Sequence, residues 1–241
     1  MRKRICFTVP IICLLCSCIR QDQTFNSLLP ECREVTFMKE NGNDKGDAAE
    51  QWGKGYALPI TALERKEAED VCETVLELMS DIYAQTDKGS AINTVLDDET
   101  IDKMQNRIKE KGYPVTTGKA YAAVENYKEV EDFLTNCQEE KAGSVVLYEL
   151  HSDGSIGREK FMFNGKDMYV LSASATLNSR NICELYNISY ARIKEWKYTE
   201  TGWFGYAVCV PEPPEVTEIV NESRLIRVKP MDEKLRELSE K

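Results

Sequence analysis

The sequence predicts an α+β fold in which three helices precede an antiparallel, curved sheet. Two observations carry this prediction. In three segments before residue 143 the apolar residues recur at helical spacing, whereas after it they alternate with polar residues, as in half-buried strands. Two-residue turn signals, Asp153-Gly154 and Asn164-Gly165, then join neighbouring strands as hairpins.

Each expected helix has its own start and stop signals. Thr61 and Glu64 match a capping box at the start of the first helix, and Asp97 begins the second. Gly89 and Gly112 follow these two helices as stop signals. The expected helices span residues 61–88, 97–112 and 126–143. Their apolar faces are Val71, Val75, Leu78 and Ile82; Ile101, Met104 and Ile108; and Val130, Phe133, Leu134 and Cys137.

The alternating part of the chain predicts a meander of strands. Strands are expected over residues 145–151, 160–164, 168–176, 188–198, 203–210 and 225–228. Pro211, Pro213 and Pro214 end the sheet edge formed by the strand over residues 203–210, because proline cannot donate a ladder hydrogen bond. The order of elements resembles the cone-shaped nuclear-transport-factor-2-like (NTF2-like) superfold, in which a curved sheet wraps a long N-terminal helix. That resemblance implies a fold that hosts enzymes and non-enzymes alike.

The first eighteen residues predict export and lipid attachment. Arg2, Lys3 and Arg4 precede an uncharged run of twelve residues, which is too short to span a bilayer. The run ends in Leu15-Cys16-Ser17-Cys18, which resembles the lipobox of bacterial lipoproteins. Cleavage before Cys18 would leave its thiol carrying the lipid, with acyl chains such as palmitate holding the protein in the membrane. An ordinary secretory signal and an uncleaved anchor are the alternatives.

The sequence divides into four parts. Residues 1–18 are the expected signal peptide, and residues 19–56 read as a flexible tether with an Asn/Asp/Gly-rich stretch. Residues 57–230 form the expected single α+β domain. Residues 231–241 are expected as a short, charged tail helix, and whether the C-terminus is truncated is left open.

Composition excludes several functions. The chain has 41 Asp and Glu against 31 Lys and Arg, a formal net charge of −10. This argues against nucleic acid as a partner and against electrostatic adhesion to anionic lipid. The membrane is therefore expected as a partner only through the acyl anchor. No phosphate loop, nucleophile elbow or zinc-protease motif occurs, so we expect no catalytic residue, no metal and no cofactor.

One pattern predicts ligand binding. Tyr190, Arg192, Lys194, Trp196 and Tyr198 alternate along a predicted strand, which places aromatic and cationic side chains on one face. Such a face can stack on sugar rings or clamp an anion, and Tyr190, Arg192 and Trp196 are the candidate ligand-binding residues. The alternative is cross-strand pairing on a solvated face.

Two further groups of residues favour structural interpretations. His151 is the single histidine and alternates with Glu149 and Asp153, but it lies at an expected hairpin tip. The five cysteines beyond Cys18 contain no Cys-x-x-Cys pair, and we expect them mainly as buried small hydrophobes; a disulfide is the alternative. They are Cys32, Cys72, Cys137, Cys183 and Cys209.

From Tyr56 onward the chain resembles a family of lipoproteins of Gram-positive, gut-type bacteria, known as a domain of unknown function. The segments that carry this resemblance are 56–60, 168–172, 193–198, 202–204, 209–214 and 225–230. The resemblance implies an exported lipoprotein without an established activity. We therefore expect a non-catalytic binding or interaction module at the cell envelope, on the extracytoplasmic face. The alternative is a cone-fold domain that binds a small molecule or glycan, with or without enzymatic activity.

Overall fold

The computed structural model describes residues 53–86, 95–119, 122–178, 180–211 and 223–230, which belong to one compact unit spanning residues 42–241. The signal segment with Cys18, most of the tether, Cys32 and the tail 231–241 lie outside the described residues. The helices are α2 (Ala62–Glu77), α3 (Ser80–Gln85), α4 (Asp98–Glu110) and α5 (Lys128–Gln138). The strands are β1 (Val115–Thr117), β2 (Gly143–Leu150), β3 (Ile156–Phe163), β4 (Met168–Leu177), β5 (Cys183–Tyr198), β6 (Trp203–Val208) and β7 (Ser223–Arg227).

The helix starts follow from local chemistry. The Thr61 hydroxyl accepts the Glu64 N–H, and the Glu64 carboxylate accepts the Thr61 N–H, which completes the expected capping box. Asp97 caps α4 by accepting the Thr100 N–H at 2.7 Å. Asn126 does not begin α5. It has a positive φ of 53° and donates its side-chain amide to two carbonyl oxygens, those of residues 109 and 113.

The first expected helix is divided in two. α2 ends at Glu77 and α3 begins at Ser80, with the fully buried Met79 at the break. The break thus falls at a buried core position, which periodicity alone did not reveal.

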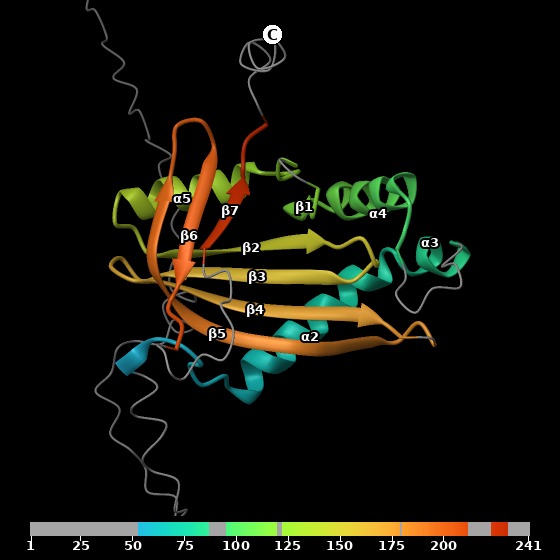
Figure 1. The fold of residues 1–241 in the computed structure, drawn as a ribbon, viewed down its shortest axis with the longest axis horizontal. Helices are drawn as coiled ribbons and strands as arrows, with labels where there is room; N and C mark the ends of the chain where they lie inside the picture. The colour runs from blue at the N-terminus through green and yellow to red at the C-terminus, as the bar shows by residue number, and fades with distance from the viewer. Residues whose placement is uncertain (1–52, 87–94, 120–121, 179, 212–222, 231–241) are drawn as a thin grey trace, which may run out of the picture. The chain divides into compact units, whose positions relative to one another are not determined.

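The seven strands form one curled, mixed sheet in the order β1-β2-β3-β4-β5-β6-β7 (Figure 1). The predicted α+β class is confirmed, but the prediction of a wholly antiparallel sheet is wrong. β1, which sequence analysis did not identify, pairs parallel with β2, and the other neighbours are antiparallel. β3 and β5 also begin earlier than expected, at Ile156 and Cys183.

The two faces of the sheet carry separate cores. On β3, Arg158 and Lys160 point to the face that packs on α2, where both bind Glu67. Phe161 points to the opposite face and contacts Phe204 of β6 with ring centroids 5.3 Å apart. We call the face that packs on α2 the outer face and the opposite one the inner face. The sheet curls so that β6 and β7 lie over the inner face (Figure 1). α2 therefore packs outside the curl, unlike the long helix of the expected NTF2-like cone.

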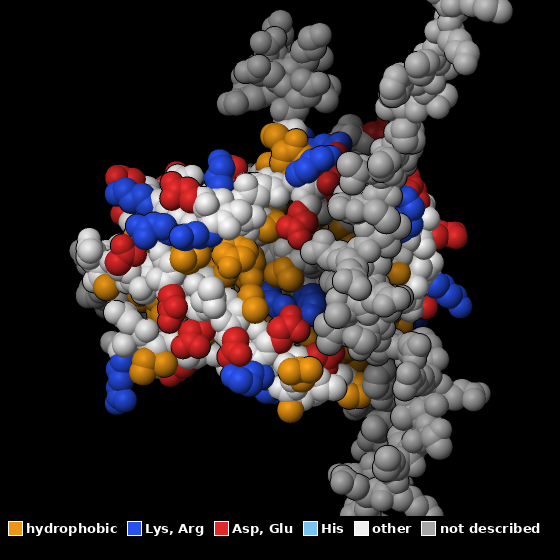
Figure 2. Space-filling view, turned by 180° about the vertical axis from the view of Figure 1, so that it is seen from behind, with side chains coloured by type: hydrophobic (Ala, Val, Ile, Leu, Met, Phe, Trp, Pro, Cys, Tyr) orange, Lys and Arg blue, Asp and Glu red, His pale blue; other side chains and the backbone are white. Residues whose placement is uncertain are grey.

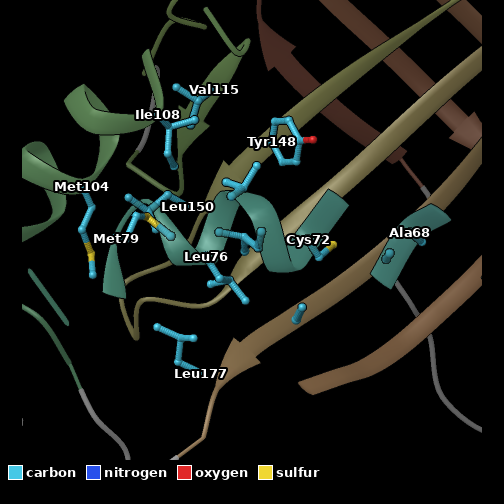
Figure 3. Close-up of a cluster of buried hydrophobic side chains, with 14 of the residues drawn as sticks. Ala68, Cys72, Leu76, Met79, Met104, Ile108, Val115, Tyr148, Leu150 and Leu177 are labelled. Carbon is cyan, nitrogen blue, oxygen red and sulfur yellow. The ribbon is translucent and has the colours of Figure 1, made fainter. Parts of the chain in front are cut away.

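The outer core is built mainly from α2, α3, α4 and the facing strand residues. Figure 3 shows Cys72, Leu76 and Met79 of α2 among other buried side chains, with Tyr148 and Leu150 of β2 nearby. On the inner face, α5 packs against β2 and contributes Phe133 and Leu134 to a second core. The same strands thus bury apolar residues on both faces, which explains their runs of apolar residues.

One short segment, residues 123–125, links the two edge strands of the sheet, β1 and β7. Glu125 exchanges two backbone hydrogen bonds with Val115 of β1, at 3.2 and 2.8 Å. The Val124 N–H donates to the carbonyl oxygen of Arg227 in β7 at 3.0 Å. Residues 123–125 therefore bring the curled sheet close to a barrel.

Figure 2 shows acidic and basic side chains intermingled on the described part of the face seen from behind. No helix within the described ranges has the length and apolar character of a membrane span.

Candidate functional site

The inner face is hollowed beside its aromatic core. Two adjoining cavities, of about 240 and 370 Å³, lie there. Both lie on the inner face. We call the smaller one, which β4 and β5 border, the inner cavity, and the larger one, which β1 and β7 border, the outer cavity. Glu149, Glu159 and Arg224 border both of them. Cavities of this kind in the mouths of barrels are common binding sites.

Glu159 is the central residue of this site. It lies in the middle of β3, points to the inner face and is 7% exposed. Its carboxylate accepts a hydrogen bond from the Tyr206 hydroxyl at 2.9 Å and one from Arg224 Nη1 at 2.6 Å. β6 and β7, which fold over the inner face, supply these two partners, so the curl of the sheet assembles the site.

Burial dominates the electrostatics of this group. It raises the pKa of Glu159, and the charge of Arg224 and the hydrogen bond from Tyr206 offset only part of the effect. Burial and the neighbouring Glu159 charge raise the pKa of Tyr206, so its hydroxyl stays protonated and available as a donor. Burial is expensive for an ionised carboxylate, and two fixed donors offset part of that cost here.

Small polar residues keep the inner cavity open. Ser172 of β4 faces Ser189 of β5 in register, and Ser174 and Asn187 form the next pair along the strands. These side chains are too short to fill the space between the curled strands. Next to this space, aromatic rings fill the inner face: Phe161, Phe204 and Tyr206 pack at centroid distances of 5.2–5.3 Å, and Tyr206 also borders the cavity.

The structure brings together two of the three residues in the predicted His151 cluster. Glu149 and His151 both border the inner cavity, with Nδ1 of His151 3.9 Å from Oε1 of Glu149. Asp153 instead accepts hydrogen bonds from the backbone and hydroxyl of Ser155 and so stabilises the turn. Within the described ranges, no group of three or more His, Cys, Asp or Glu side chains is placed to hold a metal ion.

The predicted aromatic–cationic stripe does not share one face. The pairing of β5 with β6 shifts register between Ile193 and Glu195, and the bulge reverses the alternation. Tyr190 is buried in the outer core, whereas Trp196 packs on the inner core against Phe163. Arg192 lies 3.5 Å from Asp167. Tyr190, Arg192 and Trp196 are therefore not brought together, and their role in ligand binding stays a prediction.

The described cysteines are free thiols: Cys72 and Cys137 are buried, and Cys183 and Cys209 are partly buried. Burial raises the pKa of the Cys72 and Cys137 thiols to about 12. Both thiols are therefore protonated and unreactive at neutral pH, which agrees with their expected role as small hydrophobes.

Sequence reasoning missed Glu159, Tyr206 and Arg224. The contacts from Glu159 to Tyr206 and Arg224 span 47 and 65 positions in the chain, so no local motif records them. One signal was present. Arg158, Glu159 and Lys160 are three consecutive charges followed by the apolar residues 161–163. In a strand, successive side chains point to opposite faces. A run of three charges inside a sheet that is covered on both faces therefore indicates buried ion pairs.

Comparison with known proteins gives a family without an assigned activity. Residues 65–241 match a family of unknown function (DUF6070). No curated protein and no solved structure matches the chain.

Proposed function

The chain belongs to this family of unknown function, and we propose that it is a lipid-anchored protein of the cell envelope whose folded body binds a small polar ligand in the inner cavity. The proposal has two parts, binding and anchoring, which rest on separate observations and have separate tests.

The buried acid in the cavity carries the binding proposal. Ligand sites combine a preformed hollow with a few fixed polar groups, and strongly perturbed carboxyl groups cluster in such places. Glu159 meets both conditions, because it borders the cavity and is fixed by Tyr206 and Arg224. A sheet serving only as an interaction surface needs neither the open volume nor the buried charge. This favours ligand binding over a purely structural role.

The binding proposal is tested by filling the cavity. Ser189→Phe places a ring in the space that Ser189 borders, between β4 and β5. Lys197→Phe, at an exposed position of the same strand, is the matched control. The full chain in detergent is screened against a metabolite and glycan library by thermal shift. We expect ligands that stabilise the wild type and the control but not Ser189→Phe; hits that bind all three equally would place binding elsewhere.

The anchoring proposal is supported by the lipobox-like segment that ends at Cys18. Acylation of one thiol contributes about 0.8 kcal/mol for each buried CH₂, so two or more chains suffice for stable attachment. Cys18→Ala is expected to abolish the mass increase of the lipid and to release the protein from, or leave it unprocessed in, the membrane fraction. Unchanged mass and processing in Cys18→Ala would contradict acylation, without affecting the ligand-binding test.

A further inference from the structure

We infer that the ligand of the inner cavity carries a primary ammonium group and that Glu149 receives it. This inference rests on the proposed ligand-binding function and adds the chemical class of the ligand. Three kinds of observation support it: the charge balance of the cavity, the surroundings of its aromatic rings, and the hydrogen-bond acceptors along its strands.

The inner cavity has a surplus negative charge. Arg224 and Glu159 neutralise each other at 2.6 Å. Arg158 belongs to a bordering strand, but its guanidinium lies on the outer face, 2.9 Å from Glu67. Glu149 therefore supplies the unbalanced charge among the described side chains that border the cavity. Its side chain is 34% exposed, so an incoming cation can reach it.

Neither of the nearby basic side chains, His151 and Lys119, is hydrogen-bonded to Glu149. His151 Nδ1 is 3.9 Å from the Glu149 carboxylate, which is beyond hydrogen-bond length. In the outer cavity, Lys119 is paired with Asp98 and Asp102 at 3.2 and 3.0 Å. An anionic ligand would thus meet Glu149 and an already neutralised Arg224, which disfavours phosphates and carboxylates.

The aromatic rings near the cavity favour an amine over a sugar. Sugar rings commonly bind by stacking on an open aromatic face. The Tyr206 ring is packed against Phe161 and Phe204, with centroids 5.3 and 5.2 Å away. In the outer cavity, the guanidinium of Arg227 lies 4.7 Å from the centre of the Trp203 ring and covers it. Neither ring therefore offers a free platform to a pyranose.

The strands also supply acceptors for an ammonium group. Its three N–H donors need oxygen acceptors in addition to one carboxylate. Ser172, Ser189 and Asn187 border the same cavity and carry side-chain oxygens that accept such bonds. A carboxylate together with hydroxyl and amide oxygens complements a small amine.

The test compares three four-carbon probes of equal length: putrescine with two ammonium groups, neutral 1,4-butanediol, and succinate with two carboxylates. Binding to the full chain in detergent is measured by ligand-observed NMR and titration calorimetry. We expect putrescine to bind roughly tenfold or more tightly than the other two, with an affinity that falls as salt rises. Glu149→Gln should weaken putrescine by about tenfold or more, whereas Glu110→Gln, at an exposed position of α4, should not.

The contrary outcomes are distinct from failure of the proposed function. Butanediol or succinate binding as tightly as putrescine overturns the ammonium inference, and if Ser189→Phe abolishes that binding, the cavity remains a ligand site. Absence of putrescine binding also overturns the inference, whatever the library screen finds. Putrescine binding that Glu149→Gln leaves unchanged overturns the assignment of Glu149.

Discussion

Replacing Tyr206 by Phe should destabilise the protein measurably, although the ring that packs in the inner core is retained. The Tyr206 hydroxyl donates to the Glu159 carboxylate at 2.9 Å, and both residues are under 9% exposed. Above the raised pKa of Glu159, where its carboxylate is ionised, a buried hydrogen bond to this charged group contributes about 1.5–3 kcal/mol, so the free energy of unfolding should fall by roughly that amount.

Tyr198→Phe is the matched control, because it removes the same atom from a different setting. The Tyr198 hydroxyl is buried and has no hydrogen-bond partner among the residues that the structure describes. Its removal relieves a desolvated polar group, so the substitution should be close to neutral or slightly stabilising. Both variants lose one hydroxyl from a buried ring, and the difference between them isolates the bond to Glu159.

Chemical denaturation of the full chain in detergent, followed by tryptophan fluorescence, gives the two free energies. Thermal melts should show a decrease of roughly 3–12 °C for Tyr206→Phe and little change for Tyr198→Phe, given about 2–4 °C for each kcal/mol in a domain of this size. A Tyr206→Phe variant as stable as the wild type, or equal losses in both variants, would refute the claim that this hydroxyl stabilises a buried, ionised Glu159.

Three further predictions follow from single side chains. Gly154→Ala places a methyl group 2.9 Å from the Tyr83 ring at a φ of +81°, so it should lower the melting temperature more than Gly112→Ala, where the φ is also positive but nothing lies within 4 Å. Leu134→Ala, at a fully buried position of α5, should cost about 2–5 kcal/mol in denaturant titrations. Burial raises the pKa of Glu159 above its ordinary value of 4.5, so the native state retains this proton where the unfolded chain has lost it. Stability should therefore fall as pH rises through that window, and Glu159→Gln should flatten the decline in pH-dependent melts; a steeper decline in the variant would contradict it.

The starts of two helices were predictable because their signals are local. Thr61, Glu64 and Asp97 cap helices through atoms within three residues of each other. The hairpin turn at Asp153-Gly154 is likewise written into two neighbouring residues, with Gly154 at positive φ. Chemistry of this range is visible in a single sequence, so the α+β class followed from it.

The site was not predictable because it depends on pairings between distant strands. The bulge in β5, where its pairing with β6 shifts register, puts Tyr190 and Trp196 on opposite faces of the sheet. β1 is three residues long and pairs parallel with a strand that begins beyond an intervening helix. The Glu159 partners come from strands that reach it only after the sheet has curled. Periodicity assigns alternating faces, but it cannot show where the alternation breaks.

The segment of residues 123–125 has a consequence for how copies of this chain behave at high concentration. The outermost strands of an open sheet present unpaired N–H and C=O groups that recruit other chains. Here one short stretch of backbone bonds to β1 through Glu125 and to β7 through Val124. Each border is thereby covered at one point from within the molecule, which hinders edge-to-edge pairing there. Because a single stretch serves both borders, its detachment would unmask two aggregation-prone edges together.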